Sequence, residues 1–123
     1  MKKVTAILAL GACIGLAYVA PASAADAETQ VTIKGPGNVF GFVSSDKLNK
    51  CAKDRKVKLY KQKGDIGGGD DKYTGLKYLA DDKDGDRYKW DAGNPGLNSG
   101  KYYARAPKID GCQADNSKTL VVP

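Results

Sequence analysis

Residues 73–91, YTGLKYLADDKDGDRYKWD, contain two runs of alternating apolar and polar residues on either side of an acidic turn. Every second residue of the first run is apolar from Leu76 on, and Tyr88 and Trp90 alternate likewise in the second. Alternation with period two is typical of a β-strand with one buried face. Asp84-Gly85 is a common hairpin-turn dipeptide. We therefore predict strands at 73–80 and 87–91, joined by a turn at 81–86.

The same alternation recurs along the rest of the chain, between turns rich in glycine, proline and asparagine. We predict five further strands, at 29–34, 38–44, 55–62, 101–106 and 117–122. Seven short strands with frequent turns predict an all-β fold, a seven-stranded antiparallel β-sandwich of prealbumin-like or Ig-like type. Two sheets must meet because each strand has one apolar face to bury. Helix content should be very low.

Residues 1–24 have the layout of a secretory signal peptide. A positive start at 2–3 precedes an uncharged apolar run at 4–20, and the small residues at 22–24 match a signal-peptidase site. We predict that cleavage after residue 24 leaves a single domain at 25–123 without a transmembrane span. The protein is then expected to be secreted, periplasmic or associated with the cell envelope.

Two alternatives to cleavage remain open. The apolar run at 4–20 is at the short limit for a membrane-spanning anchor. Leu10-Gly11-Ala12-Cys13 resembles the lipobox of bacterial lipoproteins, in which the cysteine is acylated. The apolar run continues after Cys13, whereas a lipoprotein would begin a polar tether there.

Two cysteines follow the signal, Cys51 and Cys112. An even pair in a small exported domain predicts one disulfide. Acylation of Cys13 would leave the same pair. The bridge would close a loop of roughly 60 residues, which the chain-entropy model values at about 4 kcal/mol.

The charge of the chain is mildly basic. Removal of Lys2 and Lys3 lowers the net charge from +6 to +4. Basic and acidic residues are interleaved, as at 53–56, rather than clustered. This pattern predicts a solvated mixed-charge surface and no nucleic-acid partner, with weak attraction to an acidic cell envelope still open.

Several motifs in series resemble a known family. They are Cys51 followed by 55–60, the turn at 82–88, the Gly-Lys-Tyr of 100–105, and Cys112 with Ser117. The series resembles small exported bacterial domains of the carboxypeptidase-regulatory-like, transthyretin-like (prealbumin-like) type, loosely over 38–122. The resemblance implies a seven-stranded sandwich that serves as an accessory, spacer or binding module, and it transfers no catalytic residues.

An acidic cluster at the predicted turn is the sharpest chemical feature. Asp82, Asp84 and Asp86 could offer hard oxygen ligands to calcium, the one cofactor considered. An EF-hand loop does not fit, because counting from Asp82 places Gly85 at the fourth position instead of the sixth. The alternative is a plain hairpin turn.

Aromatic side chains suggest a second site. Trp90 and Tyr103 could stack on sugar rings of a glycan, although sandwich cores use the same residue types. Tyr102 and Tyr103 are adjacent on one predicted strand and should point to opposite faces, so one of them is expected at the surface.

The sequence offers few candidate catalytic residues. The chain contains no histidine, which removes His-based triads, dyads and zinc sites. The glycines at 64–69 are not followed by a helix, so they predict a flexible loop rather than a phosphate cradle. We therefore do not expect an enzyme.

The composition and motifs together favour an exported, non-enzymatic binding or structural module that recognises an envelope component or an extracellular protein or glycan. Contacts would come from the loops at 45–54, 63–72 and 92–99. The alternatives are a secreted enzyme inhibitor acting through a loop and a carbohydrate-binding module. The ligand and the oligomeric state are not predicted.

Overall fold

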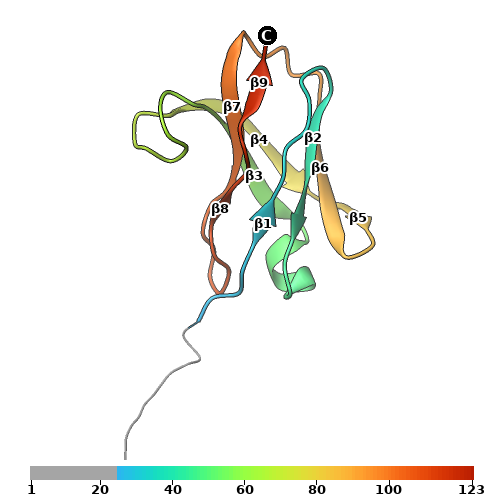
Figure 1. Cartoon of the computed structure of the whole chain (residues 1–123). Helices are drawn as coiled ribbons and strands as arrows, with labels where there is room; N and C mark the ends of the chain where they lie inside the picture. The colour runs from blue at the N-terminus through green and yellow to red at the C-terminus, as the bar shows by residue number, and fades with distance from the viewer. Residues whose placement is uncertain (1–24) are drawn as a thin grey trace, which may run out of the picture.

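Two antiparallel sheets packed face to face form the domain, in a computed structural model that describes residues 25–123 (Figure 1). The predicted signal peptide, with Cys13, lies outside the described residues. One sheet contains, in order, β1 (Gln30–Val31), β2 (Val39–Ser44), β6 (Arg87–Gly93) and β5 (Asp82–Asp84). The other contains β4 (Lys72–Ala80), β3 (Arg55–Lys61), β7 (Gly100–Ala106) and β8 (Asp115–Asn116), with β9 (Leu120–Val122) also paired to β7. The predicted all-β sandwich is confirmed.

The described chain has nine strands instead of seven, because two short strands form outside the predicted ones: β5 within the predicted turn 81–86, and β8 just before the predicted strand 117–122. The predicted strand 117–122 is shorter, since β8 ends before it and β9 begins only at Leu120. Ser117 lies between them, where its hydroxyl accepts a hydrogen bond from the amide of Ala104 and donates one to the carbonyl of Lys118. The side chain thus replaces one rung of the strand ladder.

The predicted hairpin between 73–80 and 87–91 is wrong in its partners. β4 pairs only with β3, and the chain then crosses to the other sheet before β5 begins. The true hairpin joins β5 to β6 through Gly85 and Asp86, with Gly85 at φ 64° as a two-residue turn requires. Alternation identifies a strand with one buried face, but both sheets bury such a face, so it does not identify the neighbour.

The predicted strand at 29–34 is reduced to two residues, β1. The carbonyl of Thr32 accepts a hydrogen bond from the indole nitrogen of Trp90 at 3.2 Å. Gly41 permits this approach, because a Cβ there would overlap the Thr32 carbonyl and the Trp90 ring. The indole thus occupies the interior space that a side chain at 41 would otherwise fill.

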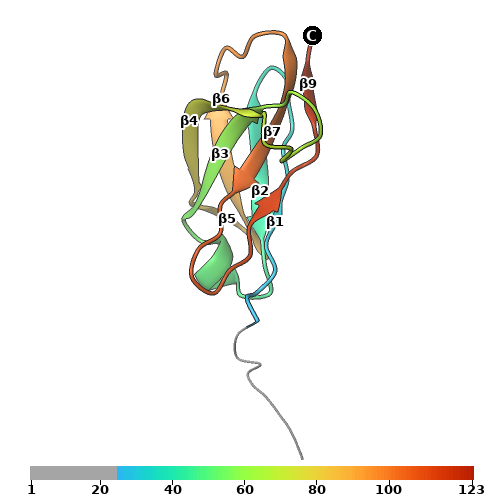
Figure 2. The same ribbon diagram turned by 90° about the vertical axis from the view of Figure 1, so that its left-hand side faces the viewer.

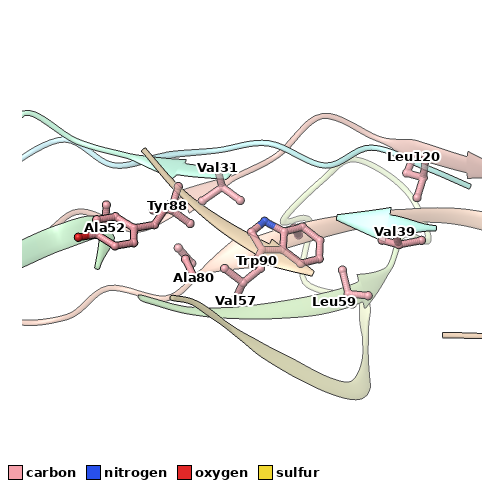
Figure 3. Packing of buried hydrophobic residues seen from close by; sticks show 12 residues of the cluster. Val31, Val39, Ala52, Val57, Leu59, Ala80, Tyr88, Trp90 and Leu120 are labelled. Carbon is pink, nitrogen blue, oxygen red and sulfur yellow. The ribbon is translucent and has the colours of Figure 1, made fainter. Parts of the chain in front are cut away.

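The core lies between the two sheets and centres on Trp90, which is fully buried (Figure 3). Its ring stacks on Tyr78 across the interface, with centroids 6.0 Å apart. The other fully or nearly buried members come from both sheets: Val31, Val39, Val43, Val57, Leu59, Ala80, Tyr88, Ala104, Ala106 and Leu120. Burial of one such aliphatic side chain contributes about 1.5–3 kcal/mol.

Candidate functional site

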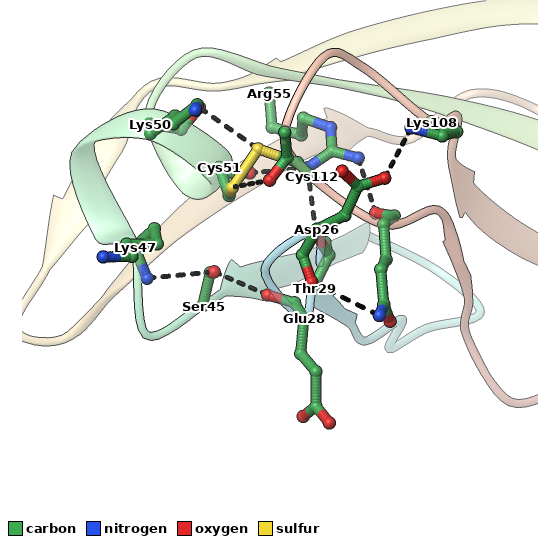
Figure 4. The surroundings of a disulfide bond; sticks show 12 residues. Asp26, Glu28, Thr29, Ser45, Lys47, Lys50, Cys51, Arg55, Lys108 and Cys112 are labelled. Carbon is green, nitrogen blue, oxygen red and sulfur yellow. Dashed lines mark hydrogen bonds and ion pairs between the residues drawn. A yellow bond between two sulfur atoms is a disulfide. The ribbon is translucent and has the colours of Figure 1, made fainter. Parts of the chain in front are cut away.

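One end of the sandwich is cross-linked by a disulfide and by hydrogen bonds around it (Figure 4). Cys51 and Cys112 form the predicted bridge, with Cα atoms 5.5 Å apart and both residues fully buried. Cys51 belongs to a short helical segment, η3 (Leu48–Ala52), within the predicted loop 45–54. The bridge therefore joins the helical turn before β3 to the loop after β7.

Arg55 lies beside the disulfide as a buried cation that sequence inspection did not single out. Its guanidinium donates to the carbonyls of Cys51, Pro107 and Gln113 and to the hydroxyl of Thr29, at 2.7–3.0 Å. Burial lowers the pKa of this side chain. The side chain joins the helical turn, the loop after β7 and the segment before β1, so we assign it a structural role at this end.

The outer face of the four-stranded sheet carries paired charges. Arg87 lies opposite Asp84 in the β5–β6 register and forms an ion pair with it at 3.0 Å. Lys89 lies opposite Asp82 and contacts Asp91 at 3.7 Å. Each cation also covers a phenylalanine ring of β2, so this face is neutralised and its aromatic rings are capped.

The outer face of the five-stranded sheet, which Figure 2 shows from the front, has a different pattern. Lys58 on β3 lies directly opposite Lys77 on β4 and directly opposite Arg105 on β7. We call these three residues the cationic row. Within residues 25–123, no acidic side chain forms an ion pair with any of them. Like charges directly opposite each other on a sheet are destabilising.

A row of tyrosines runs beside the cationic row on the same face. Tyr60 lies opposite Tyr73 on one side and Tyr103 on the other. Its ring is 5.4 Å from that of Tyr73 and stacks on that of Tyr103 at 5.5 Å. Tyr73 is 41% exposed. We call these three side chains the tyrosine row.

Both residues predicted to stack on a glycan are buried in the structure. Trp90 is fully buried between the sheets, and Tyr103 is 2% exposed. Tyr102 and Tyr103 do point to opposite faces, but both are buried, because Tyr102 lies on the interior side and the loop 63–71 covers Tyr103. The accessible rings are those of Tyr60 and Tyr73, which two-residue alternation could not distinguish from core tyrosines.

The loop 63–71, which we call the glycine loop, is held against this face by Asp71. Its carboxylate accepts hydrogen bonds from the amides of Lys63 and Gly67 and, at 2.7 Å, from the hydroxyl of Tyr103. The amide of Lys63, followed by the Tyr103 hydroxyl, lowers the pKa of Asp71. Burial, with the bond to Asp71, raises the pKa of Tyr103 to about 12.

A hollow of about 370 Å³ lies between the glycine loop and the sheet. It is lined by Tyr60, Tyr103 and Arg105 from the sheet, by Asn116, and by Ile66, Gly67, Gly69 and Asp71 of the loop. The guanidinium of Arg105 donates to the side-chain oxygen of Asn116 at 2.8 Å, which leaves further N–H groups for a ligand. The hollow therefore combines an aromatic ring and a guanidinium on its sheet side with the carboxylate of Asp71 on its loop side.

The predicted calcium ligands are not brought together. Asp82 and Asp84 lie on β5, Asp84 binds Arg87, and Asp86 lies in the turn. Within residues 25–123, no group of three or more carboxylate, cysteine or histidine side chains is placed to hold a metal ion. Pairing of Asp84 with Arg87 competes with its use as a calcium ligand.

Comparisons with known proteins gave no match to this chain. No family model, curated protein or solved structure matches the chain. The transthyretin-like resemblance therefore stays a prediction. In the described part of the chain, no helix has the length and apolarity needed to cross a membrane.

Proposed function

We propose that the protein is an exported, non-enzymatic binding module whose ligand surface is the outer face of the five-stranded sheet. The cationic row carries this proposal. Opposed like charges reduce the stability of a sheet, and the other sheet places acids opposite its cations. A surface that keeps three opposed cations without acids suits an anionic ligand from outside the chain.

Binding is a better reading of this surface than catalysis. The chain has no histidine. Asp71, the carboxylate in the hollow, already accepts hydrogen bonds from three donors, and they favour its ionised form. A carboxylate held in this way positions a loop and is a poor proton acceptor for a substrate.

An oxidising compartment outside the cytoplasm is compatible with the buried disulfide. Cell envelopes display acidic polymers, and these are the anionic ligands that an exported module of net charge +4 would meet. We therefore place the ligand in the envelope or on an extracellular partner.

Co-sedimentation of the oxidised 25–123 protein with washed envelope, at low and high salt, tests the proposal. The variant Lys58→Gln/Lys77→Gln removes two charges from the cationic row. The matched control Lys83→Gln/Lys89→Gln removes one exposed and one half-buried lysine from the four-stranded sheet, with the same net charge. We expect at least a tenfold loss of affinity in the first variant and little change in the control.

Equal losses in the two variants would contradict the proposed surface, because binding would then depend only on net charge. Unchanged binding in both variants, with loss on replacement of residues 64–69 by serine, would instead favour a loop-mediated inhibitor. Melting temperatures of all variants verify that each one is folded.

A further inference from the structure

We propose that the ligand of this surface is an acidic polysaccharide, a chain of sugar rings that carry carboxylates. This proposal rests on the proposed function and names the class of ligand. Two parallel rows on one sheet face support it, one of cations and one of aromatic rings.

The cationic row has the geometry of a repeating anion site. Lys77, Lys58 and Arg105 occupy register-matched positions on three neighbouring strands. Neighbouring strands are about 4.8 Å apart, so the row extends about 10 Å across the sheet. One small anion could bridge two of these side chains, whereas a polymer with an anion on each repeat could engage all three.

The tyrosine row places a second requirement on the ligand, in addition to negative charge. Tyr60 is two residues after Lys58 on β3, and Tyr103 is two residues before Arg105 on β7, so the rings and the cations share one face. Lys58 also places its ammonium 5.3 Å from the ring centre of Tyr73. A ligand that follows both rows needs flat apolar ring faces and, beside them, anionic groups.

Sugar rings with carboxylates meet this requirement. The C–H faces of a pyranose stack on aromatic rings, and a carboxylate at the ring edge can reach a neighbouring ammonium or guanidinium. The hollow under the glycine loop extends the surface past Tyr60, where the guanidinium of Arg105 offers paired N–H donors.

Single-stranded nucleic acid also combines rings with anions, but the compartment implied by the disulfide favours the glycan. The disulfide fits an oxidising compartment, where nucleic acid is not the common polyanion.

Affinities for four defined polymers test the ligand class by calorimetry at fixed salt: polygalacturonate, neutral dextran, poly-glutamate and single-stranded DNA. We expect polygalacturonate to bind at least tenfold more tightly than each of the others. Poly-glutamate has the carboxylates without the rings, and dextran has the rings without the carboxylates, so each isolates one row.

Two variants on β4 separate stacking from charge. Tyr73→Ala removes the most exposed ring of the tyrosine row. Leu79→Ala removes an apolar side chain of similar exposure, 47% against 41%, from the same strand outside that row. We expect Tyr73→Ala to weaken polygalacturonate binding about tenfold, since aromatic stacking contributes about that factor, and Leu79→Ala to leave it unchanged.

Equal affinity for poly-glutamate and polygalacturonate, or an unchanged affinity in Tyr73→Ala, would overturn the glycan proposal. Tighter binding of single-stranded DNA would overturn it in favour of nucleic acid. If the cationic-row variant loses envelope binding while the wild type does not bind polygalacturonate, the proposed function stands and only the ligand class fails. If the wild type binds neither envelope nor polygalacturonate, both proposals fail.

Discussion

The outer faces of the two sheets use the same kinds of side chain in opposite ways. On the four-stranded sheet, Arg87 and Lys89 are paired with acids and lie over phenylalanine rings. On the five-stranded sheet, Lys58 faces two other cations. The first face satisfies its charges internally, while the second retains unneutralised cations beside accessible tyrosine rings. This difference supports the proposal that the face of the five-stranded sheet is the ligand surface.

Removal of the disulfide by Cys51→Ala with Cys112→Ala is the most severe test, because both faces depend on one cooperative unit. The bridge closes a sequence separation of 61 residues, and we expect a loss of about 4 kcal/mol in the free energy of unfolding. Urea unfolding should be followed by Trp90 fluorescence and by far-ultraviolet circular dichroism. Non-coincident transitions would show that the sheets unfold separately and that the faces cannot be compared within one two-state domain.

Alkaline pH should act on the five-stranded face through Tyr103. Its folded pKa, raised to about 12, exceeds the value of about 10 for an unfolded tyrosine. The folded state thus binds the phenolic proton more tightly, so this stabilisation is complete below about pH 10 and is lost as the pH rises toward 12.

Tyr103→Phe should therefore reduce stability by up to about 2 kcal/mol at neutral pH, with a smaller difference from wild type above pH 10. Unfolding free energies from pH 7 to 11.5 measure the two curves. A difference in unfolding free energy that stays constant across this range would mean that folding does not raise the pKa of Tyr103.

Arg87→Ala should weaken the four-stranded face without affecting ligand binding. The substitution removes the ion pair with Asp84 and the guanidinium that lies 3.5 Å from the ring centre of Phe42. We expect a loss of about 1 kcal/mol in thermal or urea unfolding. Reduced envelope binding in the folded variant would show that the ligand surface is not confined to the five-stranded sheet.

Lys77→Glu should give the smallest effect on stability and is the sharpest comparison. An acid opposite Lys58 imitates the pairing on the other sheet and should raise the unfolding free energy by about 0.5 kcal/mol. The same change should weaken envelope binding. A variant that is less stable than wild type, or that binds as well, would contradict the view that the cationic row trades stability for binding.

Strand periodicity predicted most of the fold because the signal is local. The strands at 38–44, 55–62, 73–80 and 101–106 are observed within one or two residues of the predicted bounds. The pairing of Cys51 with Cys112 followed from their number. Which sheet each strand belongs to was not predictable. The chain crosses from one sheet to the other between β4 and β5, and this crossing depends on contacts with strands distant in sequence.

The candidate site was less accessible to sequence reasoning. Tyr60 and Tyr73 were visible as aromatic residues, but nothing local distinguishes their accessible rings from Tyr88, which is buried in the core. The opposition of Lys58 with Arg105 joins residues 47 positions apart, and only the register of β3 against β7 brings them together. A cationic row across strands leaves no basic run along the chain.

The sequence alone thus determined the all-β class and the single disulfide, because each depends on composition or on short-range alternation, while export stays a prediction. Tertiary structure decided which tyrosines are exposed, which carboxylate holds the glycine loop, and which cations lack acidic partners. These properties depend on strand register and on which face a loop covers. Both arise from long-range packing, which a side-chain period of two residues does not specify.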